Sequence, residues 1–194
     1  MRDLNILIVG VGGQGTLLAS VLLGNIALEK GFDVKMSEVH GMAQRGGSVV
    51  THVRISENTV TSPIIEEGEA DVILAFEMLE GYRYVPYLKK GGTMFINNQE
   101  INPMPVIIGA EKYPESLEEY FKKELPNVKI IDALKIALEC GTSKAVNVVL
   151  LGVLSTSLPF EEEIWIKKIE ENIKPAFVEL NKKAFAMGRE LEKI

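Results

Sequence analysis

A glycine-rich turn between an apolar segment and a helical pattern constrains this chain more than any other feature of its sequence. Residues 4–9 form a continuous apolar run rich in β-branched residues, which is typical of a buried strand. Residues 14–30 carry leucines and valines at helical spacing, and Gly31 follows as a stop signal. Between them stands Gly10-Val11-Gly12-Gly13-Gln14-Gly15, a Gly-x-Gly-x-x-Gly pattern. This order of strand, glycine turn and helix predicts a Rossmann-like α/β domain.

The glycine turn is suited to holding a phosphate group. Gly10 would permit the tight turn, Gly12 would let the backbone approach a phosphate, and Gly15 would allow the helix to pack closely on the strand. The helix start also offers N–H groups to an anion. Glu38 ends the second predicted strand 23 residues after Gly15, near where an acidic residue holds a ribose hydroxyl in dinucleotide-binding domains. The candidate cofactor-binding residues are Gly10, Gly12, Gly13, Gln14, Gly15, Glu38 and Arg45. The alternative is that the glycines serve only the turn between strand and helix and bind no phosphate.

The next two predicted strands depart from a standard dinucleotide-binding domain. Residues 33–37 and 48–55 are both expected to be strands, and only residues 39–47 separate them. A parallel crossover needs about a dozen or more residues. We therefore expect the third strand to run antiparallel, which makes the sheet mixed.

The remaining segments complete an α/β, three-layer Rossmann-like domain with a helical C-terminal extension. Further strands are expected at 71–76, 93–96, 106–108 and 128–131, with Gly91-Gly92 ending the unit before the second of these. Helices are expected at 79–84, 116–125, 132–140, 143–157, 161–174 and 175–192. We predict that residues 1–158 form the α/β domain. Residues 159–194 would form amphipathic helices, anchored through Phe160 and Trp165 on the same domain or on a partner.

Charge and cysteine content narrow the classes of function. The net charge of −6 argues against binding to nucleic acid or to an anionic membrane. The single cysteine, Cys140, excludes an internal disulfide and an iron–sulfur cluster held by this chain alone, and no metal site is expected. The longest apolar run is about half of the ~20 residues that span a bilayer. A cytoplasmic protein is expected.

The segment from Glu38 to Ser48 is the most unusual stretch of the chain. It has few core-forming residues, and glycines lie on both sides of Arg45. An arginine can bind a phosphate or a carboxylate with two hydrogen bonds. We predict a site here, for a ligand or for a subunit; a solvated loop is the alternative. The candidate interface residues are His40, Met42, Gln44, Arg45, Gly46 and Gly47. No catalytic residue is expected. Nothing in the sequence supplies His40 with an orienting carboxylate or a nucleophile, and His52, in an alternating strand, is expected to be a structural side chain.

The glycine turn, the segment 37–49 and the C-terminal stretch 175–185 together resemble the gamma-type subunits of 2-oxoacid:ferredoxin oxidoreductases. The resemblance spans essentially the whole chain and is greatest to the small (beta) subunits of the indolepyruvate enzymes. It implies a non-catalytic subunit, inactive alone. Its partner would be a large alpha subunit that carries thiamine diphosphate and ferredoxin-type iron–sulfur clusters.

The resemblance also implies a reaction and a place for this chain in it. The complex would oxidatively decarboxylate aryl pyruvates such as indolepyruvate to an acyl-coenzyme A, with ferredoxin as electron acceptor. The glycine turn would help to hold the phosphates of coenzyme A, and residues 38–48 would face the alpha subunit. Two alternatives stay open. One is a stand-alone NAD(P)- or flavin-dependent oxidoreductase, which Glu38 favours, and the other is an assembly subunit without a ligand.

Overall fold

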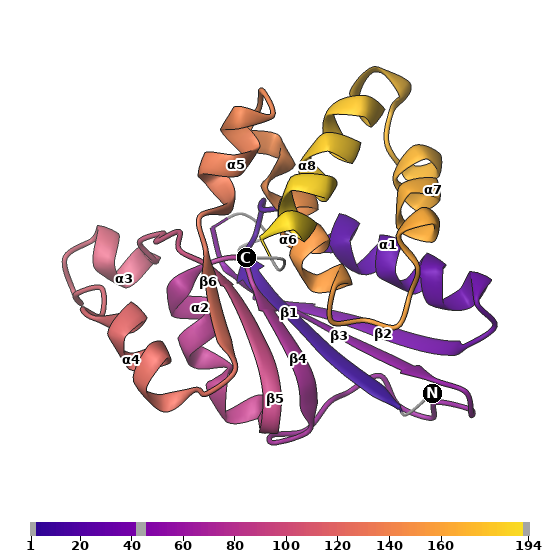
Figure 1. Ribbon diagram of the computed structural model, residues 1–194. Helices are drawn as coiled ribbons and strands as arrows, with labels where there is room; N and C mark the ends of the chain where they lie inside the picture. The colour runs from indigo at the N-terminus through magenta and orange to yellow at the C-terminus, as the bar shows by residue number, and fades with distance from the viewer. Residues whose placement is uncertain (1–2, 42–45, 192–194) are drawn as a thin grey trace.

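A mixed sheet forms the centre of the molecule (Figure 1). A computed structural model describes residues 3–41 and 46–191 of the chain. Within them the strand order is β2-β3-β1-β4-β5-β6. The strands are β1 (Leu4–Val11), β2 (Asp33–His40), β3 (Ser48–Ser56), β4 (Ala70–Ala75), β5 (Leu88–Asn97) and β6 (Val128–Ile131). β3 pairs antiparallel with both β1 and β2, whereas β1, β4, β5 and β6 run parallel. The predicted antiparallel third strand is confirmed.

Helices cover both faces of the sheet and complete three layers. Figure 1 shows α1, α6, α7 and α8 on one side and α2 and α4 on the other. The helices are α1 (Thr16–Glu29), α2 (Met78–Arg83), α3 (Met104–Ile107), α4 (Leu117–Glu124), α5 (Ala133–Glu139), α6 (Val146–Ser155), α7 (Glu162–Asn172) and α8 (Val178–Glu190). Short 3-10 turns lie at Val85–Tyr87, Ser143–Ala145 and Pro175–Phe177. The predicted three-layer α/β fold class is confirmed.

Both faces of β1 are buried, which explains its continuous apolar sequence. Successive side chains of a strand point to opposite faces. Ile6 and Ile8 therefore join the cluster beneath α1 and α6, whereas Leu7 and Val9 join the cluster beneath α2 and α4. A strand buried in this way needs no polar alternation.

The C-terminal helices pack into the same core cluster as α1 and α6. The ring of Trp165 stacks on that of Phe185, with 5.8 Å between centroids, and meets Phe160 edge-on at 6.4 Å. All three side chains belong to that cluster. Phe160 also meets Phe32 of the α/β domain edge-on, with 6.1 Å between ring centroids, so the tail packs on the domain.

Three local predictions were wrong. Residues 106–108 were expected to form a strand, but Met104–Ile107 is the short helix α3, with Pro103 at the N-cap position and Pro105 in its first turn. β2 continues beyond residue 37 to His40, because its last residues pair with Val49 and Val50. Gly91-Gly92 lies inside β5 rather than before it, next to a shift in register against β4.

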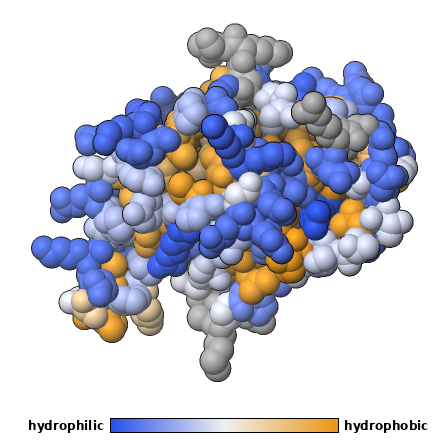
Figure 2. All heavy atoms as spheres, turned by 90° about the horizontal axis from the view of Figure 1, so that it is seen from below, coloured by the Kyte–Doolittle hydropathy of each residue, from blue (hydrophilic) through white to orange (hydrophobic). Residues whose placement is uncertain are grey.

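Polar side chains cover most of the face seen from below in Figure 2, with hydrophobic atoms visible between them. Among the described residues, none of the helices has both the length and the apolarity that a membrane crossing requires.

Candidate functional site

The two segments singled out in the sequence meet through backbone hydrogen bonds. The N–H of Gly12 donates to the carbonyl of Gly47 at 2.8 Å, and the N–H of Gly46 donates to the carbonyl of Gly12 at 3.1 Å. These bonds extend the β1–β3 ladder, whose last pair is Val11 with Ser48. The glycine turn and the end of the 38–48 segment are therefore one structural unit at the carboxyl end of β1.

The glycines have different structural roles from those the sequence predicts. Gly15 starts α1 with a φ of 85°, and a Cβ there would lie 2.6 Å from Nδ2 of Asn147 on α6. Only glycine suits that conformation and that space. It permits close packing against a helix, not against the strand. Gly10 lies in β1 rather than in the turn, and a Cβ there would lie 2.9 Å from Cβ of Phe76.

A pocket of about 450 Å³ opens where the glycine turn, the first turn of α1 and the end of β2 meet. It is lined by Gly12, Gly13, Gly15, Thr16, Leu17, Glu38, His40 and Val49. α1 begins with no side-chain cap, so its first N–H groups are available to a ligand. Glu38 therefore lines the same pocket as Gly12, Gly13 and Gly15.

The polar groups of this pocket are few. Thr51 Oγ1 donates to Oε2 of Glu38 at 3.4 Å, and Nδ1 of His40 donates to the carbonyl of Gly41 at 2.9 Å. Among the described lining residues there are helix N–H donors and one carboxylate, but no lysine or arginine. Such a lining can hold hydroxyl groups at Glu38 and an anion at the start of α1.

Gln14 braces the turn instead of lining the pocket. Its Oε1 accepts from the N–H of Val11 at 2.7 Å. Its Nε2 donates to the carbonyl of Phe76 at 3.0 Å and to Oε1 of Gln99 at 3.2 Å. The side chain therefore ties the glycine turn to the end of β4 and to the segment after β5.

Two buried glutamates at the start of α2 escaped the sequence analysis. Glu80 accepts from Ser48 Oγ at 2.5 Å and from Arg83 Nη1 at 2.7 Å. Burial raises the pKa of Glu80 above its usual range. This carboxyl fixes the start of β3, and with it the end of the 38–48 segment.

Glu77, the second buried glutamate, connects the start of α2 to the segment that follows β5. Its Oε2 caps α2 by accepting from the N–H of Glu80 at 2.8 Å. Its Oε1 accepts from the hydroxyl of Tyr113 at 2.6 Å and from the N–H of Ile101 at 2.9 Å. Burial and the bond to Glu77 raise the pKa of Tyr113 well above its usual range. The available signal was two glutamates, three residues apart, directly after a buried strand.

Several predicted residues lie elsewhere or outside the described residues. Met42, Gln44 and Arg45 fall in the part of the chain that is not described. His52 is buried, and its Nδ1 accepts from the N–H of Ile65 at 3.1 Å, a structural role. The residues that the structure describes contain no group of three or more metal-ligating side chains.

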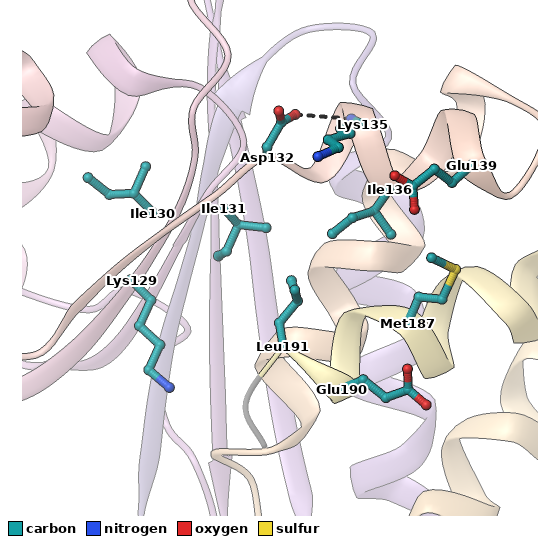
Figure 3. A pocket seen from close by; sticks show the side chains of 10 residues that line it. All are labelled: Lys129, Ile130, Ile131, Asp132, Lys135, Ile136, Glu139, Met187, Glu190 and Leu191. Carbon is teal, nitrogen blue, oxygen red and sulfur yellow. Dashed lines mark hydrogen bonds between the residues drawn. The ribbon is translucent and has the colours of Figure 1, made fainter. Parts of the chain in front are cut away.

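A larger hollow of about 710 Å³ lies between β6, α5 and α8 (Figure 3). Figure 3 shows Ile131, Ile136 and Leu191 around it, and Lys135 joined by a hydrogen bond to Asp132 beside them. None of the sequence motifs reaches this hollow. We therefore place the candidate site at the smaller pocket, where both motifs meet.

Fold and site together define a Rossmann-like domain with an antiparallel third strand, whose glycine turn is tied to a second loop at a small polar pocket. Of the ionisable side chains in the described part of that pocket, Glu38 is bonded to Thr51 and His40 to the carbonyl of Gly41. The chain belongs to the pyruvate ferredoxin/flavodoxin oxidoreductase family, whose model matches residues 5–191. The family resemblance predicted from the motifs is confirmed.

Relatives of known sequence and structure agree with this assignment. Indolepyruvate oxidoreductase subunit IorB of Pyrococcus horikoshii is 45% identical over 194 residues, which covers 97% of this chain and 95% of the relative. The gamma subunit of keto/oxoacid ferredoxin oxidoreductase from Geobacter sulfurreducens matches with a TM-score of 0.70 at 27% identity, over 96% of each chain. The 2-oxoglutarate:ferredoxin oxidoreductase of Magnetococcus marinus, solved with 2-oxoglutarate, coenzyme A and succinyl-CoA bound, matches in fold with a TM-score of 0.75 at 20% identity. That match covers all of this chain but 31% of the other.

Proposed function

We propose that this chain is the small, non-catalytic subunit of an indolepyruvate:ferredoxin oxidoreductase. The observation that carries the proposal is the likeness, over nearly the full length of both chains, to a subunit of indolepyruvate oxidoreductase. The small pocket supports it as well, because its described lining offers binding groups: the N–H groups at the start of α1 and the carboxylate of Glu38. The chain alone is inactive, and its role is to complete the enzyme.

In this proposal the redox cofactors belong to a large alpha subunit. Thiamine diphosphate and ferredoxin-type iron–sulfur clusters are bound there, and ferredoxin accepts the electrons of the complex. The lone Cys140 fits this division, since it is half-buried with its Sγ 3.3 Å from Sδ of Met187. The complex converts an aryl pyruvate and coenzyme A to acyl-coenzyme A and carbon dioxide, and it works in the cytoplasm.

The pocket at the glycine turn contributes to binding coenzyme A. The N–H groups at the start of α1 face a phosphate, and Glu38 accepts from a ribose hydroxyl. Arg45 would supply the positive charge that the described lining lacks; it belongs to the connection between Gly41 and Gly46, outside the described residues.

A charge at Leu17 tests this role. Leu17 is exposed on the first turn of α1 and lines the pocket. Leu17→Glu stabilises the helix start but repels a phosphate, whereas Leu17→Gln is a matched neutral control. With the assembled complex, we expect Leu17→Glu to raise the KM for coenzyme A about tenfold, equivalent to about 1.4 kcal/mol. The KM for indolepyruvate should stay unchanged, and Leu17→Gln should behave like the wild type.

Two experiments distinguish the alternatives from this proposal. The meeting of Glu38 with the glycine turn favours a stand-alone NAD(P)- or flavin-dependent oxidoreductase. Binding of NAD(H) or of a flavin by the isolated chain, followed by fluorescence titration, would support that alternative. An activity that requires this chain while the KM for coenzyme A ignores Leu17→Glu would support an assembly subunit without a ligand.

A further inference from the structure

The short helix α3 carries the most exposed large hydrophobic side chains in the described part of the molecule. Met104, Ile107 and Ile108 are 66%, 65% and 71% exposed. They lie within five residues of one another, and we refer to residues 104–108 as the α3 tip. Figure 1 places α3 at the margin of the molecule, away from α1, α6 and α8. Exposed apolar side chains that lie together in this way are characteristic of an interaction site.

The α3 tip is held in place before any partner binds. The N–H of Ile107 donates to the carbonyl of Pro103 at 3.1 Å, and the N–H of Ile108 donates to that of Met104 at 3.0 Å. The tip lies within the excursion of residues 101–113, and both ends of this excursion are bound to one buried carboxylate oxygen. Glu77 Oε1 accepts from Ile101 on one side and from Tyr113 on the other. A surface that is already ordered loses less entropy on binding.

The charges around the tip favour a partner of opposite sign. The exposed ionisable side chains that flank it are Glu100, Glu111, Lys112 and Glu115, three acidic and one basic. The whole chain carries a net charge of −6. A second copy would therefore bring like charges together at this surface, which costs binding energy. A partner with a basic rim around an apolar depression would complement both features.

We propose that the α3 tip inserts into an apolar, basic-rimmed depression on the large subunit of the oxidoreductase. This deepens the proposed function and rests on it, because it requires the large subunit. The same buried pair of glutamates links the tip to the candidate site: Glu77 holds the excursion, and Glu80 holds Ser48 at the start of β3. The tip and the 46–48 segment thus belong to one edge of the molecule. Docking of the tip therefore also positions the 46–48 segment against the large subunit.

Charge substitutions in the tip test the proposal. Ile107→Glu and Ile108→Glu place a carboxylate at the centre of the contact. The matched control is Leu28→Glu, because Leu28 at the end of α1 is 58% exposed and lies in neither the tip nor the pocket. We expect each isoleucine variant to raise the dissociation constant for the large subunit at least about tenfold. The control should stay within about twofold of the wild type, with equal Tm values for all four proteins. Glu111→Lys, which reverses a rim charge, should weaken binding and reduce its dependence on salt.

The outcomes separate this proposal from the proposed function. If the wild-type chain does not bind the large subunit at all, the proposed function is wrong. If the wild type binds and Ile107→Glu and Ile108→Glu bind equally well, the docking proposal is wrong. Loss of self-association of the isolated chain in the isoleucine variants, measured by sedimentation, would assign the tip to a second copy and would also overturn it.

Discussion

Single polar side chains at the carboxyl edge of the sheet decide how the site is held. Gln14 ties the glycine turn to β4, and Glu80 ties the start of β3 to α2. Glu80 is buried and Gln14 is half-buried, and the loops at the pocket depend on the bonds of both. Because a buried polar group without a partner is costly, removal of either partner should be felt in stability.

Ser48→Ala tests the bond to Glu80. The substitution leaves a buried carboxyl oxygen without its 2.5 Å donor, so we expect a loss of about 1–3 kcal/mol in the free energy of unfolding. Urea denaturation measures it. Ser157→Ala is the control, since Ser157 is exposed and its hydroxyl bonds only to its own turn, at Leu154. An equal effect of the two substitutions would contradict the assigned role of Glu80.

His52 predicts a dependence of stability on pH. Burial lowers its pKa below the ordinary value of 6.5 in the folded chain. Above that value the imidazole is neutral in both states, so its contribution is fully present. As pH falls below about 6.5 the unfolded state takes up a proton first, and stability is lost until the pH passes the folded pKa. Unfolding from pH 8 to 5 should show this loss in the wild type, and a smaller loss in His52→Asn. Parallel curves for the two proteins would refute the assignment.

At the scale of elements, α6 and α8 pack more closely than side chains would allow. A Cβ on Gly152 would lie 2.2 Å from the carbonyl oxygen of Phe185, and one on Gly188 would lie 2.1 Å from that of Val149. The two helices therefore meet backbone to backbone, which fixes α8 on the core helix α6. The amphipathic pattern of α8 predicts that it packs, but it does not predict this crossing.

Gly152→Ala tests the contact between the two helices. The new methyl group clashes with backbone rather than with a flexible side chain, so α8 must shift away from α6. We expect destabilisation of about 1–3 kcal/mol, measured by thermal or urea unfolding. Gly41→Ala is the control, because a Cβ at Gly41 meets nothing within 4 Å. A stable Gly152→Ala protein would mean that α8 does not dock as described.

Sequence periodicity predicted those elements whose burial is uniform along their length. The strand predicted over residues 4–9 was found because residues 6–9 are fully buried. The helix predicted over 143–157, observed as α6, was found because residues 147–155 are buried on all sides. The antiparallel third strand was predicted from a short connection. The strand expected at 106–108 failed, because a short apolar run cannot distinguish strand from helix without its context.

The candidate site was predictable only in part, for a related reason. Glycines and Glu38 carry motif signals, and the structure brings them to one pocket. Glu77 and Glu80 carry only the weak signal of two glutamates after a buried strand. Their role depends on bonds to partners far along the chain: Ser48 lies 32 residues from Glu80, and Tyr113 lies 36 residues from Glu77. Whether the pocket binds coenzyme A stays a prediction.

At the scale of the whole molecule, the chain has the form of a component. Its core is complete on both faces of the sheet, while its described pocket offers few polar groups and its α3 tip leaves apolar side chains in solvent. A stable fold with an incomplete site and an uncovered surface is what a subunit requires. We therefore assign activity to the assembled enzyme.

Indolepyruvate-dependent reduction of ferredoxin tests this central claim most directly. The rate should be measured in the presence of coenzyme A with the large subunit alone, this chain alone, and the two together. The account predicts coenzyme A-dependent reduction only with both chains, and none with this chain alone. A large subunit that is fully active without this chain, or an isolated chain that oxidises indolepyruvate by itself, would contradict it.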